Sequence, residues 1–181
     1  MGRVLYIRHG QSQANLAGIL AGGSNDSNLT DLGRQQARQA GRALKNNSIN
    51  KIITSPLSRA LETAQIIAAE IGYDVQRIEL DPRLKEYELG VGQGQSLEGM
   101  TAEKIVSFPG AEKPAEFAKR VKSALYSAWE DSGTVVIVAH GGVSRLIDCL
   151  RIGKDPKWFY DMPNHGNATV VELDLTWLKD A

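Results

Sequence analysis

Two histidines in this chain stand at the ends of apolar segments and directly before a glycine. His9 follows the apolar residues 4–7 and Arg8, and His140 follows the apolar run Thr134–Ala139. An imidazole can act as a nucleophile, a base or a metal ligand. The planar guanidinium of Arg8 is suited to bind a phosphate or a carboxylate. The repeated pattern therefore predicts a site in which histidines act beside a bound anion.

A further candidate is Arg59, which follows Ser55 and Pro56 closely in the sequence. These two residues predict the start of a helix, with Ser55 as the N-cap and Pro56 at the first helical position. An arginine in the first turn opposes the helix macrodipole. Arg59 is therefore better explained if it shares an anion with the helix N-terminus. The alternative is a solvated arginine on the surface.

Other kinds of site fit the sequence less well. A zinc site is disfavoured because the arginines would repel the cation, and because His165 is the only other histidine. The Gly-x-Ser-x-Gly pattern of a serine nucleophile and the Walker A loop are both absent. Two arginines and two imidazoles around one concavity suit a tetrahedral dianion.

Strands whose carboxyl ends meet must position these side chains. Residues 4–7 and 134–139 show no alternation of polar and apolar residues, as expected for strands buried on both faces of a parallel sheet. Ligands bind beyond the carboxyl ends of the strands in open α/β sheets. If the two strands are neighbours, His9 and His140 meet at the same edge of the sheet.

Sequence periodicity and turn residues predict the remaining elements. Strands and helices that alternate along the chain indicate a layered α/β fold with helices on both faces of the sheet. We find no internal repeat and no linker, so residues 1–181 are predicted to form a single domain. The predicted helices are one that begins after Thr30 as N-cap, one that begins at Ser55, and 114–129 and 143–150, with short helical turns within 13–17 and 96–108. The predicted strands are 51–54, 75–80 and 167–175. Irregular loops are expected at 18–28 and 84–94.

The composition is that of an ordinary globular protein. Of 181 residues, 42% are hydrophobic and 23% are charged, and 21 basic residues balance 21 acidic ones. A net charge of zero argues against non-specific binding to nucleic acid or an anionic membrane, so an anion site must be local. The single cysteine, Cys149, excludes an internal disulfide and fits a reducing compartment. With no apparent signal peptide and no apolar run long enough to span a bilayer, we expect a cytoplasmic protein.

Taken in order, several segments of the chain resemble the histidine phosphatase superfamily, which is also called phosphoglycerate mutase-like. The resemblance covers nearly the whole chain. It implies a three-layer α/β/α sandwich with a mostly parallel central sheet, and a phosphohistidine intermediate formed without a metal or an organic cofactor. The matching residues are Arg8-His9-Gly10-Gln11-Ser12 with Asn15, Leu29-Thr30 with Gly33 and Gln36-Ala37, Ser55 to Ala60 with Glu62-Thr63-Ala64, Leu84-Lys85-Glu86 with Gly90 and Gly94, Val138 to Gly142, and the late strand after Asn167.

The resemblance also implies roles for individual residues. His9 matches the nucleophile, and Glu86 matches the proton donor. Glu88, two residues further on, is the rival for that second role. The residues that match the phosphate pocket are Arg8, Arg59 and His140.

Other positions match the substrate side of the family's site. Asn15 matches a substrate contact, Gly22 lies where the family's substrate loop lies, and Gly141 is counted with His140 among the binding positions. The sequence departs from the family pattern at Gly92-Gln93, where Trp and Glu are common, and at 164–166, where His165 is unusual. We consider both segments as candidates to face the leaving group.

Three classes of function are compatible with these residues. We favour a metal-independent phosphatase that hydrolyses small phosphate monoesters through a phosphohistidine on His9, with a small phosphorylated metabolite as its partner. The second class is a phosphoglycerate mutase-type isomerase. The family's mutases carry an extra insert between the Glu86 loop and the second His-Gly strand, whereas only residues 95–139 separate Gly94 from His140 here. The third class, a protein-directed or non-catalytic phosphate-binding member, is disfavoured because every catalytic position is filled.

Overall fold

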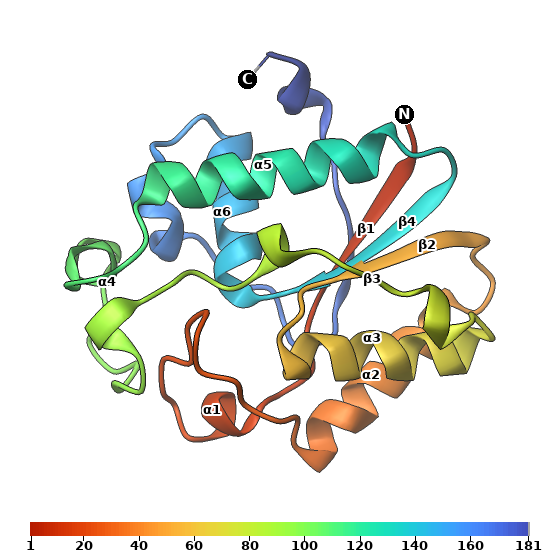
Figure 1. Ribbon diagram of the computed structural model, residues 1–181, viewed down its shortest axis with the longest axis horizontal. Helices are drawn as coiled ribbons and strands as arrows, with labels where there is room; N and C mark the ends of the chain where they lie inside the picture. The colour runs from red at the N-terminus through yellow and green to blue at the C-terminus, as the bar shows by residue number, and fades with distance from the viewer. Residues whose placement is uncertain (181) are drawn as a thin grey trace.

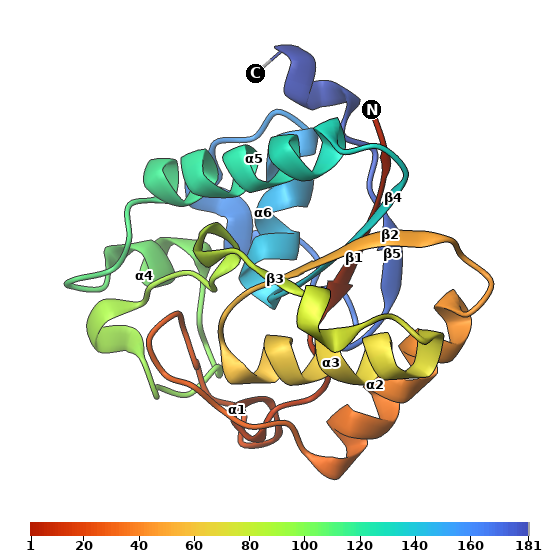
Figure 2. The same cartoon turned by 45° about the vertical axis from the view of Figure 1, so that its right-hand side comes forward.

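A computed structural model describes residues 1–180 and shows a five-stranded sheet between two layers of helices (Figures 1 and 2). The order of the strands is β3-β2-β4-β1-β5. The pairs β1–β4, β2–β4 and β2–β3 are parallel, and only β5 runs antiparallel to its neighbour β1. The strands are β1 (Arg3–Arg8), β2 (Ile49–Thr54), β3 (Glu79–Leu80), β4 (Thr134–Ala139) and β5 (Val170–Glu172).

The longer helices cover both faces of this sheet. α2 and α3 pack side by side on one face, and α5 and α6 lie on the other (Figures 1 and 2). The α-helices are α1 (Gln13–Leu16), α2 (Asp31–Leu44), α3 (Ser58–Ile71), α4 (Ala102–Ser107), α5 (Pro114–Glu130) and α6 (Gly141–Arg151); short 3-10 helices span Val75–Arg77, Pro82–Leu84, Gly90–Gly92, Pro156–Asp161 and Thr176–Asp180.

Alternate side chains of β1 and β4 enter two separate cores, which is why these strands show no polar face. Tyr6 and Ile137 pack with α5 and α6, whereas Leu5 and Val136 pack with α2 and α3. A side chain points to the opposite face at each successive strand position. Both faces of the central strands are therefore apolar and buried, and the predicted three-layer α/β/α sandwich with a mostly parallel sheet is confirmed.

The register of β1 and β4 brings the two histidines together. Arg8 pairs with Ala139 at the carboxyl ends of the strands, and the His9 backbone N–H donates to the Ala139 carbonyl oxygen over 2.9 Å. The rings of His9 and His140 follow with their centroids 5.3 Å apart. The expectation that these strands are neighbours is therefore correct.

The predicted start of α3 at Ser55 and Pro56 is wrong. The helix begins at Ser58, because the backbone of Ser55, directly after β2, still bonds to β4 and donates its N–H to the Val138 carbonyl oxygen over 3.0 Å. Its hydroxyl is bonded to His140. Asp26 supplies the missing cap from a distant loop, and its carboxylate accepts the Ser58 backbone N–H at 2.9 and 3.0 Å.

Two predicted strands are shorter than the sequence pattern suggested. Within 75–80, only Glu79–Leu80 is a strand, and a 3-10 helix occupies Val75–Arg77. Within 167–175, only Val170–Glu172 is a strand, because the chain turns at Ala168, whose φ is +52°. The side chain of Asn167 bonds to the His9 carbonyl oxygen, which directs this segment toward the end of β1.

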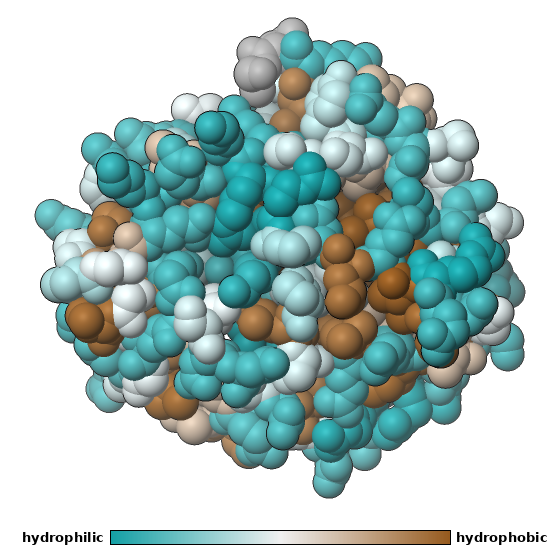
Figure 3. All heavy atoms as spheres, viewed as in Figure 1, coloured by the Kyte–Doolittle hydropathy of each residue, from teal (hydrophilic) through white to brown (hydrophobic). Residues whose placement is uncertain are grey.

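Hydrophilic side chains cover most of the face seen in Figure 3, with apolar groups gathered in smaller areas between them. Cys149 is fully buried in the core beside α5 and α6. Among the helices of residues 1–180, none combines the length and apolar character required to cross a bilayer.

Candidate active site

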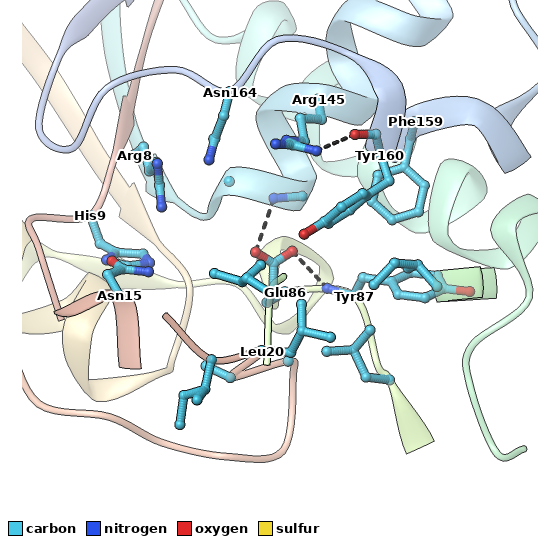
Figure 4. Close-up of a pocket in the computed structure, with 18 of the residues that line it drawn as sticks. Arg8, His9, Asn15, Leu20, Glu86, Tyr87, Arg145, Phe159, Tyr160 and Asn164 are labelled. Atoms are coloured by element: carbon cyan, nitrogen blue, oxygen red, sulfur yellow. Dashed lines mark hydrogen bonds between the residues drawn. The ribbon is translucent and has the colours of Figure 1, made fainter. Parts of the chain in front are cut away.

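A cavity of about 220 Å³ opens at the carboxyl ends of β1 and β4 (Figure 4). It is lined by every site residue predicted from the sequence except His140, which is fully buried directly beside His9. The predicted residues that line it are Arg8, His9, Asn15, Gly22, Arg59, Glu86 and Gly141. Strand ends, a helix start and two loops thus converge on one concavity, as expected for an open α/β sheet.

His9 is held as a neutral imidazole with one defined tautomer. Its ring is 3% exposed, and Nδ1 lies 2.7 Å from the Gly10 carbonyl oxygen. A carbonyl oxygen only accepts hydrogen bonds, so Nδ1 carries the proton and Nε2 keeps its lone pair. Burial, together with the charges of Arg59 and Arg8, holds the pKa of His9 well below its ordinary value. This imidazole can therefore act as a nucleophile at neutral pH.

Gly10 allows the chain to pass close to α2 directly after His9. A Cβ atom at Gly10 would lie 2.3 Å from the carbonyl oxygen of Gly33, in the first turn of that helix. The Gly10 backbone N–H donates to Thr63 Oγ1 on α3 over 3.1 Å. Contacts with both helices thus fix the position of the residue after His9.

Arg8 and Arg59 are positioned by backbone carbonyl groups. Arg8 Nη1 donates to the His165 carbonyl oxygen over 2.9 Å, and Arg8 Nε is buried without a partner among the described residues. Arg59 is 1% exposed and donates from Nη2 to Gly22 O over 3.0 Å and from Nη1 to Asn25 O over 3.2 Å. The alternative of Arg59 as a solvated surface arginine is therefore wrong.

His140 bonds to a residue that the sequence had suggested as a helix cap. Its Nε2 lies 2.7 Å from Ser55 Oγ, and its Nδ1 is buried without a partner in the described part of the chain. Burial first, and then the charge of Arg59, holds the pKa of His140 well below its ordinary value. The Ser-Pro pattern at 55–56 had suggested a role for Ser55, but in the wrong structural context.

Glu86, and not Glu88, faces the cavity. Its carboxylate oxygens accept the backbone N–H groups of Tyr87 at 2.8 Å and Gly142 at 2.9 Å (Figure 4). A Cβ atom at Gly142 would lie 2.2 Å from Glu86 Oε1, so only glycine leaves room for this contact. Glu88 is held by the Ser24 hydroxyl and by Gln93 Nε2 and does not line the cavity.

Asn15 is fixed by a capping box at the start of α1. Its backbone N–H donates to Ser12 Oγ, and its Oδ1 accepts the Ser12 backbone N–H over 3.2 Å. Asn167 also donates to Asn15 Oδ1 over 3.3 Å and to the His9 carbonyl oxygen over 2.9 Å. Asn167 therefore connects the late loop with both β1 and α1, although the sequence indicated it only as the start of a strand.

Of the two departures from the family pattern, only the segment 164–166 reaches the cavity, and it does so through Asn164 and not through His165. Gly92, Gln93 and His165 do not line the cavity. The His165 ring points to Asp148, with 2.8 Å between Nε2 and Oδ2, and only its carbonyl oxygen contacts Arg8. Within the predicted segment 164–166 it is Asn164, and not the unusual His165, that lines the cavity.

Sequence reasoning also missed the outer wall of the cavity. Arg145 on α6, and Phe159 and Tyr160 on the 3-10 helix Pro156–Asp161, line it together (Figure 4). Arg145 lies four residues after Gly141 on α6, so both are on one face of this helix; the predicted helix 143–150 contained Arg145 but not Gly141. No pattern in the sequence indicated that the segment at 156–161 lies against this helix.

The described residues offer a polar site without a cluster of metal ligands. Within residues 1–180, no group of three or more His, Cys, Asp and Glu side chains could hold a metal ion. The cavity instead combines arginines, a neutral histidine and one carboxylate. Such a set can bind a tetrahedral anion, attack it and exchange a proton with it.

The fold and this group of side chains define an α/β protein with an anion-binding cavity built around a histidine. The chain belongs to the histidine phosphatase superfamily (branch 1), whose sequence model matches residues 4–177. It is 36% identical over 186 residues to a protein of Salmonella choleraesuis (strain SC-B67) named probable phosphoglycerate mutase GpmB, across 95% of this chain and 84% of that protein.

Two solved structures resemble the fold closely. A mycobacterial glucosyl-3-phosphoglycerate phosphatase in complex with VO3 has a TM-score of 0.78 and 26% identity, covering 96% of this chain and 91% of that chain. Bacillus stearothermophilus YhfR has a TM-score of 0.81 and 26% identity, covering 94% of this chain and 89% of that chain. These relatives carry the names of both a phosphatase and a mutase.

Proposed function

We propose that this protein is a phosphatase that hydrolyses small phosphate monoesters through a phosphohistidine on His9. The observation that carries the proposal is a neutral His9, with Nε2 unprotonated, in a cavity that Arg8 and Arg59 also line. The two guanidinium groups match a phosphoryl dianion in charge and hydrogen-bonding geometry. A cavity of about 220 Å³ also favours a small ester over a phosphorylated protein.

In the first half of the reaction, His9 Nε2 attacks phosphorus and the bond from phosphorus to the ester oxygen breaks. Glu86 gives a proton to the leaving oxygen, which departs as an alcohol. Arg8 and Arg59 hold the phosphoryl oxygens and stabilise the charge of the transition state. The buried Nδ1 of His140 is a further group that could bind a phosphoryl oxygen, with Ser55 fixing its ring.

In the second half of the reaction, water attacks phosphorus and the bond from phosphorus to nitrogen breaks. Glu86, which has lost its proton, accepts one from the attacking water, so inorganic phosphate leaves and the starting protonation is restored. The same carboxyl group serves both steps because it stands at the position of the departing alcohol and of the incoming water.

A mutase is the second candidate, because relatives at 36% identity carry that name. We expect hydrolysis to dominate, since the short segment 95–139 contains little beyond α4 and α5 to exclude water from phosphohistidine. The measurement is incubation with 3-phosphoglycerate and 2,3-bisphosphoglycerate while phosphate and 2-phosphoglycerate are followed. Phosphate release should be the faster process. Interconversion of 2- and 3-phosphoglycerate much faster than phosphate release would establish the mutase.

Phosphatase activity should survive removal of divalent cations. The proposed chemistry relies on arginines and backbone groups to neutralise the phosphoryl charge, so it needs no Lewis acid. Phosphate release from a panel of phosphorylated metabolites should be measured before and after exhaustive treatment with EDTA, with a known magnesium-dependent phosphatase as the control. Activity lost with EDTA and restored by a divalent cation would contradict the proposed site.

A further inference from the structure

The cavity contains a third arginine, Arg145, that the proposed mechanism does not use. It projects from α6 and lies between Asn164 and Tyr160, whereas His9 lies on the other side of the cavity (Figure 4). Glu86, which we assign to the leaving oxygen, is on the same side as Arg145 in this view. Arg145 therefore stands where the leaving group of a phosphate ester would lie, rather than beside the nucleophile.

The guanidinium of Arg145 is held in a fixed orientation. Its Nη1 donates to the carbonyl oxygen of Tyr160, and its Cζ lies 4.3 Å from the centroid of the Tyr160 ring. Stacking on an aromatic ring restricts a guanidinium to one plane. The N–H groups that do not contact Tyr160 are available to a ligand, so the fork is preorganised for a planar acceptor.

Arg145 carries a charge that no side chain of residues 1–180 neutralises by an ion pair. Arg120, in the same layer, is paired with Glu112 at 2.7 Å, and Arg59 has Asp26 at 3.7 Å. Burial lowers the pKa of Arg8, the charge of Glu86 opposes this shift, and the charge of Arg145 acts in the same direction as burial. The charge of Arg145 is therefore felt at Arg8 in the same cavity.

The charges of the cavity exceed what a phosphoryl group requires. A phosphoryl dianion matches the guanidinium groups of Arg8 and Arg59, the second of which also has Asp26 at 3.7 Å, outside the cavity lining. Glu86 is the only acidic residue among those that line the cavity, and its oxygens are occupied by two backbone N–H groups. Arg145 is therefore the lining arginine that neither the phosphoryl group nor an ion pair within residues 1–180 uses, and it is the one available to the leaving group.

We propose that Arg145 determines specificity by binding a carboxylate on the leaving group, so that the preferred substrates are phosphate esters of small hydroxy acids. This inference rests on the proposed phosphatase function. A carboxylate is planar and can accept two parallel hydrogen bonds from a guanidinium. It also adds fewer atoms than a second phosphate in a cavity of about 220 Å³.

The test compares esters of similar size in which a neutral group replaces the carboxylate. One pair is 3-carboxyphenyl phosphate and 3-carbamoylphenyl phosphate; the other is 3-phosphoglycerate and glycerol 3-phosphate. The wild type should prefer the carboxylate in at least one pair. In Arg145→Gln the ratio of kcat/KM for that pair should fall about 10- to 100-fold, the scale of a hydrogen bond to a charged group. Intrinsic differences between the leaving groups cancel in this comparison of variants.

Two further variants separate the charge of Arg145 from its packing against Tyr160. Arg145→Lys keeps the charge and should retain part of the preference, whereas Arg145→Met keeps an unbranched side chain against Tyr160 without the charge and should lose it. Arg77→Gln removes an exposed arginine that stacks on Tyr73 outside the cavity, and serves as the control for a change of net charge.

The outcomes separate this inference from the proposed function. Equal losses on both members of each pair would overturn it, because Arg145 would then act on the phosphoryl group or on the cavity wall. A wild type that releases phosphate without preferring either carboxylate would overturn it without the use of any variant. Absence of phosphate release from all four esters would overturn the proposed function, and this inference with it.

Discussion

Replacement of His9 by alanine is expected to reduce turnover by about 10⁴-fold or more, the scale of loss when an enzyme loses its nucleophile. Neither nearby group can replace it: His140 lies outside the cavity lining and is fully buried with Nε2 bonded to Ser55, and the carboxylate of Glu86 is held by two backbone N–H groups. The measurement is the steady-state rate of phosphate release, combined with rapid quench to trap an acid-labile phosphohistidine. The wild type should be labelled and His9→Ala should not.

The fold should tolerate this change, because the His9 side chain stands at the end of β1 and borders the cavity. The melting temperature shows whether the variant is folded, and His9→Gln, which keeps a polar side chain of similar size, provides a second variant. A folded His9 variant that retains more than a few per cent of the wild-type turnover would rule out covalent catalysis by His9.

Substitution of Glu86 by glutamine should have an effect that depends on the leaving group. An alkoxide is strongly basic and needs a proton as it departs, whereas p-nitrophenolate is weakly basic and departs nearly unaided. General acid catalysis contributes about 10²- to 10⁴-fold. Glu86→Gln should therefore lose most of that factor in kcat/KM on an alkyl phosphate and much less on p-nitrophenyl phosphate. If water attack on phosphohistidine becomes slow, the aryl ester should also show a burst of p-nitrophenol.

Two controls make this experiment specific. Glu88→Gln is the matched control, because Glu88 is a neighbouring carboxylate that bonds to Ser24 and Gln93 and does not line the cavity. Arg59→Ala should slow both esters comparably, because it weakens the binding of the phosphoryl group whatever the leaving group is. An equal loss on the two esters in Glu86→Gln would remove Glu86 as the acid.

The sequence predicted those elements whose local residue pattern directly reflects their burial in the fold. The apolar run Thr134–Ala139 has no alternation because both of its faces are buried, and so its place in the middle of the sheet was predictable. The end of this strand before His140, like the end of β1 before His9, was predicted because the apolar run stops there and a glycine follows the histidine. Parallel strands place their carboxyl ends at one edge, but only the structure showed that β1 and β4 are neighbours, which brings the two histidines together.

Only the tertiary structure decided contacts between side chains on irregular segments. Glu86 and Glu88 lie in a loop without a period, and their directions depend on Gly142 and Ser24, which belong to other segments. Ser55 looked like a helix cap, but its backbone, directly after β2, still bonds to β4, and its hydroxyl is bonded to His140.

Arg145 shows the same limit for a residue on a predicted helix. Its spacing from Gly141 placed it near the site, yet the wall that fixes it is formed by Tyr160, on a 3-10 helix after a loop. Periodicity reports which face of an element is buried, because burial acts on each residue of that element. Periodicity does not indicate which distant polar group will contact a side chain, because such contacts form only when the layers of the fold pack together.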